Sequence, residues 1–234
     1  MRKGFTLVEL SIVLVIIGLL IGGILVAQSM IHTTKLQGVI RQLSQYDIAV
    51  SDFRTKFNQW PGDSTLFPNP GDGDGLIGDD VNNLERGNFW PHLSLGVGLK
   101  NSLGTDYIYT WPTLVGADNT MPTFNIEQDT HERGNLFVYG QWLGNKNYYW
   151  YSHAGNGNIY FWGPNYDPLR GIDSYYIDSK IDDGMPGTGN LQANSWGSST
   201  TSSDCLSGGQ YNMTSKNYAC SLFIMIGIGA GQPQ

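Results

Sequence analysis

The sequence predicts an α+β fold in which one long N-terminal α-helix packs on an antiparallel β-sheet domain. No proline occurs between Phe5 and Trp60, and apolar residues follow helical spacing over the second half of that segment. Beyond it, short aromatic runs alternate with glycine and asparagine, which is typical of strands joined by turns. We therefore divide the chain into a basic start (1–4), a helix (5–58) and a β-rich domain (59–234).

The composition excludes some classes of binding partner for the soluble part of the chain. The 234 residues include 13 lysines and arginines against 20 aspartates and glutamates, for a formal net charge of −7. This acidic balance argues against nucleic acid, and against anionic membrane surfaces, as partners of the soluble part. Charged residues make up only 14% of the chain, below the roughly 25% of average soluble domains. We expect a domain outside the cytoplasm with a neutral, hydrogen-bonding surface and an aromatic core.

The first half of the predicted helix, residues 5–27, is apolar enough to cross a membrane. Leu10–Ala27 contains no charged residue, and about 20 apolar residues suffice for a span. Arg2 and Lys3 precede it, which places the N-terminus in the cytoplasm and the later residues on the other side. A cleaved secretory signal fits less well, because the helical pattern runs straight past the small residues around Gly22.

The second half, residues 28–58, has the pattern of an amphipathic helix. Its apolar residues recur in alternating steps of three and four, so they form one narrow stripe that a domain can cover. Pro61-Gly62 then supplies a stop. A helix over 5–58 would be roughly 80 Å long at 1.5 Å per residue. The stripe consists of Leu36, Ile40, Leu43, Tyr46, Val50, Phe53 and Phe57.

The remainder of the chain predicts an antiparallel meander that covers this stripe. Its strands are Leu136–Tyr139, Tyr148–Tyr151 and Ile159–Trp162, separated by turns at Gly144–Asn147 and Gly155–Asn158. Ser174–Ile177 is predicted as a further strand, and Phe89–Leu93 with the following leucines as a short helical connection. Residues 187–203, rich in glycine, serine, threonine and asparagine, are predicted to form an exposed loop.

The N-terminal motif resembles a known family. Gly4-Phe5-Thr6-Leu7-Val8-Glu9, with basic residues before it and an apolar run after it, resembles the prepilin leader of type IV pilins and type II secretion pseudopilins. The resemblance implies a pilin-like fold. It also implies that a prepilin peptidase cuts between Gly4 and Phe5 on the cytoplasmic side and methylates the new amine of Phe5.

The resemblance further implies where the chain works and with which partners. Proteins of this family sit in the bacterial inner membrane before assembly, and then pack their helices against neighbouring subunits with the help of inner-membrane assembly machinery. The product is an extracellular or periplasmic filament, with helices in its core and globular domains outside. We therefore expect a structural subunit of a type IV pilus-like filament.

Two alternatives stay open: a pseudopilin of a type II secretion system, and a minor or tip subunit that adheres to a surface through exposed tryptophan and tyrosine. Many major pilins carry a proline partway through the membrane half of the helix. None occurs here around Gly22-Gly23, so the choice between a main and a minor subunit also stays open.

Glu9 is the only charged residue within the apolar half of the helix. A charge inside a spanning helix costs roughly 2.5–3.5 kcal/mol on insertion scales. In a filament core, each subunit would also bring the positive amine of Phe5 into apolar surroundings, and a nearby carboxylate would compensate that charge. We therefore expect Glu9 of one subunit to face Phe5 of a neighbour and to set the axial register. The alternative is a glutamate that merely reaches the cytoplasmic interface.

The two cysteines, Cys205 and Cys220, both lie in the part predicted to be exported. Disulfides persist in such compartments, which favours a bridge over two free thiols or metal ligands. A disulfide near the C-terminus also resembles the bracketed surface loop of type IV pilins, and it tilts the prediction towards a pilus subunit.

Acidic clusters are the remaining candidates for chemistry. Residues 71–80, Gly-Asp-Gly-Asp-Gly-Leu-Ile-Gly-Asp-Asp, superficially resemble a calcium loop. On the EF-hand template, however, Pro70 and Val81 fall at the two end positions, so both end ligands are missing. A looser calcium site remains as an alternative to a solvated turn, built from Asp72, Asp74, Asp79 and Asp80; major pseudopilins are known as calcium binders. A second cluster, Asp178 to Asp183, implies no particular chemistry.

No enzymatic motif emerges, so we expect no catalytic residues and no cofactor apart from calcium. The four histidines show no HExxH or paired spacing, and neither GxSxG nor a phosphate-binding loop occurs. The sequence thus predicts a structural protein rather than an enzyme.

Overall fold

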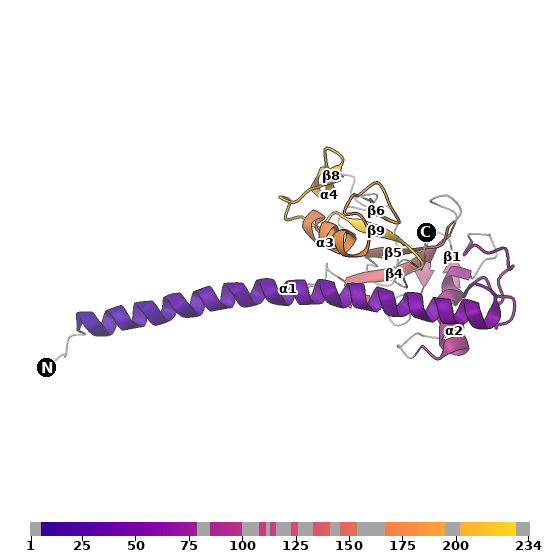
Figure 1. Cartoon of the computed structure of the whole chain (residues 1–234), viewed down its shortest axis with the longest axis horizontal. Helices are drawn as coiled ribbons and strands as arrows, with labels where there is room; N and C mark the ends of the chain where they lie inside the picture. Colours follow the sequence, from indigo (N-terminus) through magenta and orange to yellow (C-terminus); the bar gives the residue numbers. More distant parts are fainter. Residues whose placement is uncertain are drawn as a thin grey trace.

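The structure is a computed structural model, and it describes residues 6–78, 85–99, 108–110, 113–115, 123–125, 133–140, 146–153, 167–194 and 202–227. A single helix, α1, protrudes from a domain gathered around its C-terminal half (Figure 1). The prediction of a long N-terminal helix on a small antiparallel sheet domain is confirmed. The helices are α1 (Leu7–Phe57), α2 (Glu85–Val97), α3 (Gly171–Ile181) and α4 (Ser202–Cys205).

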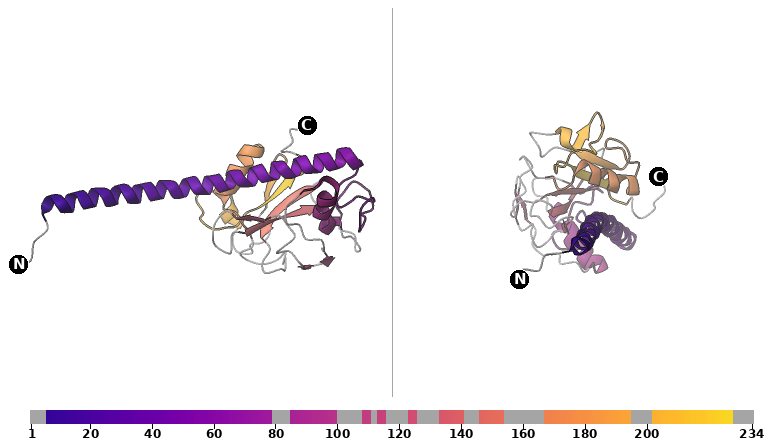
Figure 2. Two further views of the ribbon diagram at one scale, coloured as in Figure 1. Left: turned by 90° about the horizontal axis from the view of Figure 1, so that it is seen from below. Right: turned by 90° about the vertical axis from the view of Figure 1, so that its left-hand side faces the viewer.

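Helix α1 has 51 residues and is therefore about 77 Å long. Thr6 caps its N-terminus, and Asn58 ends it in the left-handed conformation with φ 53°. The predicted apolar stripe is confirmed: Leu36, Leu43 and Tyr46 are buried, while Ile40 and Phe57 are partly buried and pack against the core. The views of Figure 2 show the domain lying to one side of α1. The helix therefore contributes one face of its C-terminal half to the core.

The main sheet has five strands in the order β3-β4-β5-β9-β6, and the described neighbours pair antiparallel. Its strands are β3 (Thr123–Asn125), β4 (Arg133–Tyr139), β5 (Tyr148–His153), β6 (Leu191–Asn194) and β9 (Ser221–Met225). Two short hairpins join β1 (Ile108–Thr110) to β2 (Thr113–Val115), and β7 (Leu206–Ser207) to β8 (Gln210–Tyr211). The predicted hairpin between Leu136–Tyr139 and Tyr148–Tyr151 is confirmed, and the run Ile159–Trp162 lies outside the described residues.

Alternate residues of the sheet supply the other half of the core, as the two-residue period of a strand requires. The paired positions on one face are buried, apart from partly buried Ala193, and they pack with the α1 stripe and with Phe89, Trp90 and Leu93 of α2. The buried residues of this face are Leu136, Val138, Tyr149, Tyr151, Leu191, Leu222 and Ile224. The predicted helical connection around Phe89–Leu93 is therefore confirmed, and it contributes to the core.

Two local predictions were wrong. Ser174–Ile177 is part of helix α3 and not a strand. Its residues suit a strand locally, but the helix buries Ser174 and Ile177 on one side and leaves Tyr175 on the other. The exposed loop predicted over 187–203 contains β6, which pairs with β9 because Leu191 is fully buried opposite Ile224.

Candidate functional site

The first candidate is the N-terminal end of α1, where Glu9 closes a capping box with Thr6. The Glu9 carboxylate accepts hydrogen bonds from the Thr6 amide and hydroxyl, both at 2.8 Å, and the Glu9 amide donates to the Thr6 hydroxyl at 3.3 Å. This arrangement satisfies amides that have no partner within the helix. Gly4 and Phe5 lie outside the described residues. The carboxylate predicted to meet a neighbouring subunit is thus held at the helix start by its own chain.

The first 25 residues of α1, Leu7 to Ile31, are exposed along their whole length. Among the described residues, α1 is the one helix long and apolar enough to cross a membrane. Its apolar half projects beyond the domain, as both side views show (Figures 1 and 2). A surface of this length has to be covered by lipid or by protein.

A polar cluster marks the point where α1 enters the domain. His32 Nε2 lies 2.7 Å from Asp173 Oδ1 of α3, and Arg170 Nε donates to Asp173 Oδ2 at 2.7 Å. The Arg170 NH2 group also lies 2.8 Å from His32 Nε2. Asp173 is buried; Arg170 compensates its charge, and His32 adds a polar contact from α1. This cluster fixes α3 against α1 immediately after the apolar half.

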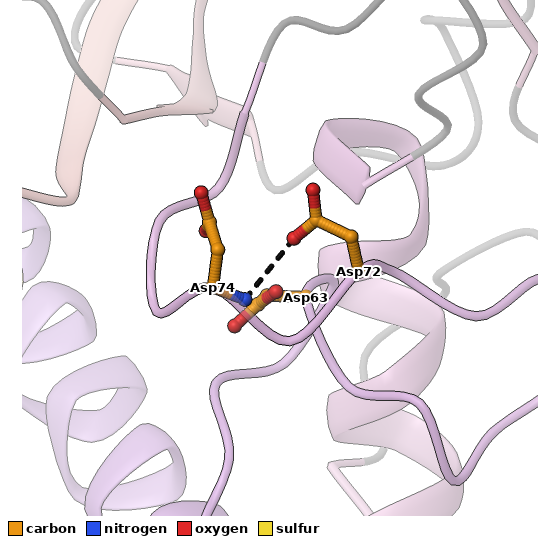
Figure 3. A group of neighbouring side chains, drawn as sticks. All are labelled: Asp63, Asp72 and Asp74. Carbon is orange, nitrogen blue, oxygen red and sulfur yellow. Dashed lines mark hydrogen bonds between the residues drawn. The ribbon is translucent and has the colours of Figure 1, made fainter.

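The acidic loop that follows α1 is the second candidate. Asp63, Asp72 and Asp74 each offer a carboxylate oxygen, and the three oxygens lie within 4.8 Å of one another (Figure 3). Asp79 and Asp80 lie outside the described residues. Asp63 was missed by sequence reasoning, because Pro68 and Pro70 separate it from the aspartates of residues 71–80. The sequence feature that could have pointed to Asp63 as a candidate ligand is its position directly after the predicted helix stop at Pro61-Gly62.

Backbone amides hold this cluster in place. Asp63 accepts from Gly73 at 2.7 Å and from Gly75 at 3.0 Å. Glu85, at the start of α2, accepts from the amides of Asp72 and Gly78. These bonds wrap the loop around two buried carboxylates.

Burial, more than any other factor, raises the pKa of Asp63, and the neighbouring carboxylates of Asp74 and Asp72 raise it further. Burial likewise raises the pKa of Glu85. Oxygen ligands of this kind suit a hard cation such as Ca²⁺. A cavity of about 490 Å³ between α1, this loop and the end of β9 is lined by Asp63, Gly73 and Gly75.

The calcium site stays a prediction, with Asp63 added to its candidate ligands. If the loop binds Ca²⁺, a hundredfold excess over the dissociation constant stabilises the protein by about 2.7 kcal/mol. The melting temperature of the full chain in detergent should then rise by roughly 5–10 °C over its value in chelator. Asp72→Ala and Asp74→Ala should remove this rise. Asp52→Ala, at an exposed position on α1, should keep it.

The second acidic cluster brings together Asp178, Asp182 and Asp183 at the end of α3, again with oxygens within 4.8 Å. Burial raises the pKa of Asp178 to about 6, although the Tyr211 hydroxyl donates to it at 2.7 Å. Asp182 accepts from the amides of Asn190 and Leu191. The cluster thus ties α3 to β6 and to the β7–β8 hairpin, which is a structural role.

Among the described carboxyl groups, buried Asp167 should have the largest effect on how the stability of the fold depends on pH. It is almost fully buried, and this raises its pKa to about 7, although Ser221 hydrogen-bonds to it. Between about pH 4 and 7 the folded protein therefore binds more protons than the unfolded chain. This group's contribution to stability falls as the pH rises through that window.

Asp167→Asn is expected to be more stable than the wild type at pH 7.5, because no carboxyl then has to ionise in a buried site. The advantage should shrink towards pH 4, where wild-type Asp167 is protonated. Urea unfolding of the full chain in detergent across this range measures both effects. Parallel stability profiles for the two proteins would contradict the prediction.

Cys205 and Cys220 form a disulfide, as the sequence predicted. The bridge closes over the β7–β8 hairpin and joins α4 to the start of β9. Two backbone hydrogen bonds between Leu169 and Cys220 connect the same point to the segment before α3. The disulfide thus fixes the hairpin to the start of β9, a strand inside the sheet.

The comparisons with known proteins agree with the N-terminal motif. Residues 1–25 match the model of the prokaryotic N-terminal methylation motif, which is the signature of type IV pilins and pseudopilins. The resemblance predicted from Gly4 to Glu9 is thereby confirmed. No curated protein and no solved structure gives a significant match to the chain.

Proposed function

We propose that this chain, which carries the signature of type IV pilins and pseudopilins at its N-terminus, is a structural subunit of a type IV pilus-like filament. One observation carries the proposal. The methylation motif at residues 1–25 runs without a break into a helix whose first half is apolar and exposed on every side.

The arrangement of domain and helix suits a filament. The domain covers one face of α1 only beyond Ile31, so nothing among the described residues blocks the apolar half (Figure 2). A membrane covers this half before assembly. After extraction, the same surface has to be covered by the α1 helices of other copies, which leaves the domains on the outside.

The N-terminal chemistry supports the same role. Cleavage between Gly4 and Phe5 removes Arg2 and Lys3 and creates a new amine on Phe5, four positions before Glu9. The capping box holds the Glu9 carboxylate near the helix start. A neighbouring subunit's amine can then share or take over this carboxylate, so that neither charge is buried without a partner.

A pseudopilin of a type II secretion system is the second candidate. The acidic loop favours it, since Asp63, Asp72 and Asp74 lie close enough together to hold a cation. Deleting the chain would separate the two candidates: a pilus subunit is needed for surface filaments, and a pseudopilin for release of secreted proteins.

The processing step tests the proposal first. Assembled protein should begin at Phe5 with a methylated amine, which the intact mass measures. The Lys+Arg count falls from 13 to 11, so the formal charge becomes −9. Gly4→Leu should leave an uncut precursor in the membrane. Met1 on assembled protein, or the absence of any filament containing this chain, would refute the proposal.

A further inference from the structure

The end of the domain nearest to the apolar half of α1 carries exposed apolar and cationic side chains. Figures 1 and 2 show α3 and the β7–β8 hairpin at this end. Ile172 is 41% exposed and Met213 is 46% exposed there, Lys216 is exposed, and Tyr218 is half-buried. We call these four residues the basal surface.

Contacts between α3 and the segment 212–218 hold the basal surface together. A Cβ at Gly171 would lie 2.3 Å from the carbonyl oxygen of Asn212, so the segment begins against the first residue of α3. It returns to the same place through Tyr218, whose ring centre lies 5.9 Å from the guanidinium carbon of Arg170. The segment therefore covers the N-terminal end of α3, and its side chains lie beside Ile172.

Two contacts with α1 fix the direction of α3. Asp173 lies 2.7 Å from His32. Three residues later, the Tyr176 hydroxyl accepts a hydrogen bond from Gln37, which is five residues after His32 on α1. Helix α3 therefore advances along α1 away from the apolar half, and its N-terminal end points back towards that half. Side chains of a helix lean towards its N-terminus, so Ile172 in the first turn projects from this end.

The candidate span of α1 sets the height of the basal surface above a membrane. About 20 residues cross the hydrocarbon core, so a span that begins at Leu10, directly after Glu9, ends near Ser29. His32 follows three residues later, about 4.5 Å further along the helix. The headgroup layer on each side of the core is roughly 5–7 Å thick. His32, and with it the first turn of α3, thus lies at the height of the headgroups.

We propose that the basal surface rests on the phospholipid bilayer that holds α1. Ile172 and Met213 reach the boundary between headgroups and acyl chains, and Lys216 lies at the lipid phosphates. Apolar and cationic side chains together bind this interface, and tyrosine is enriched at its depth. The basal surface also adjoins the part of α1 that a membrane covers, and this continuity selects lipid as the partner. The inference rests on the membrane stage of the proposed function and adds a lipid contact made by the domain.

The acidic net charge of the chain does not oppose this contact. Asp173 is paired with Arg170, and the other nearby carboxylate, Asp204, accepts hydrogen bonds from Ser215 and Asn217. Because α1 already tethers the domain to the bilayer, the contact forms at a high effective concentration and needs no attraction over a distance.

Quenching by brominated lipid tests the contact in the full chain. The chain is reconstituted into vesicles of phosphatidylethanolamine and phosphatidylglycerol, in which part of the lipid carries bromine near the headgroup end of its acyl chains. A fluorophore introduced at position 213 should lose most of its emission to this lipid and be protected from iodide in the water.

The same fluorophore at position 95 is the matched control. Leu95 is 64% exposed on α2, and the neighbouring Gly96 accepts a hydrogen bond from Lys56 of α1. Lys56 lies 24 residues after His32, about 36 Å further from the membrane along the helix. Position 95 should therefore be quenched by iodide and not by the brominated lipid.

Substitutions give an independent test. Ile172→Asp combined with Lys216→Glu should abolish the lipid quenching at position 213 and open the label to iodide, because carboxylates are costly at the acyl boundary and are repelled by the phosphates. Leu95→Asp should leave both readouts unchanged. Both chains should keep their thermal unfolding midpoint, since the substituted positions are exposed.

A fluorophore at position 20, within the apolar half of α1, separates this inference from the proposed function. If position 20 is quenched by lipid but position 213 is open to iodide, or is shielded from both quenchers by protein, the inference is wrong and the proposed function stands. Unchanged lipid quenching in the double variant would also overturn the inference alone. If position 20 is not quenched, α1 does not enter the bilayer, and the membrane stage of the proposed function fails together with the inference.

Discussion

Glu9→Ala is expected to insert into the membrane and to be cut, yet to give at least about tenfold less filament than the wild type. On the proposed function, processing depends on residues around Gly4, whereas assembly would bury the Phe5 amine of each copy. Removing one partner of a buried ion pair costs roughly 3–5 kcal/mol, and 1.4 kcal/mol already corresponds to a factor of ten. Quantitative blots of sheared filaments and of membrane fractions measure assembly and processing separately.

The capping box demands a specific control for this prediction. Glu9→Ala also removes the hydrogen bonds to Thr6, which by itself costs about 1 kcal/mol of helix stability. Thr6→Ala breaks the cap but keeps the carboxylate. Glu9→Gln keeps a hydrogen-bonding group but loses the charge. If charge compensation drives assembly, Glu9→Gln should be as defective as Glu9→Ala, and Thr6→Ala should be milder. Equal defects in Thr6→Ala and Glu9→Ala would point to capping alone.

Replacing both Cys205 and Cys220 by serine is expected to destabilise the domain by about 3 kcal/mol, the chain-entropy value for a loop of this length. For a protein of this size the melting temperature should fall by roughly 6–12 °C. The wild-type chain in detergent with a reductant should melt at the same temperature as the double variant. The prediction fails if oxidised, reduced and double-variant proteins give coincident melting curves.

The loss of stability in this double variant should be uneven within the domain. The β7–β8 hairpin has only two residue pairs of its own, and besides the disulfide it is held by the Tyr211–Asp178 hydrogen bond. Hydrogen exchange should therefore accelerate most over residues 206–219 in the double variant, and least in β4 and β5.

The sequence was most informative where the periodicity was long. The alternating steps over 28–58 predicted the buried face of α1, because a helix of this length leaves one consistent stripe. The aromatic runs predicted β4 and β5 because residues of this kind, bounded by glycine and asparagine, favour strands. Short segments were less informative. Ser174–Ile177 suits a strand as four residues, whereas in the structure it is the middle of α3, whose flanking Asp173 and Asp178 contact His32 and Tyr211.

The acidic loop shows the same limit for a candidate site. Asp72 and Asp74 were found because they alternate with glycine. Asp63 joins them because the loop folds back at Gly62, which has φ 86° and where a Cβ would lie 2.4 Å from the Glu85 carbonyl oxygen. Which carboxylates meet is decided by such tertiary contacts, and spacing along the chain does not contain them.

The position of β9 has a consequence for how the protein is made. This last described strand lies between β5 and β6, and the amide of Gly227 donates to Asp47, in the C-terminal half of α1, at 2.9 Å. The sheet is therefore incomplete until Ser221–Met225 have been synthesised. Contacts that span this much sequence form slowly. If the chain is exported and polymerised as proposed, the apolar stripe of α1 stays without its full cover until β9 has crossed the membrane, so a nascent subunit should become competent for assembly only after that step.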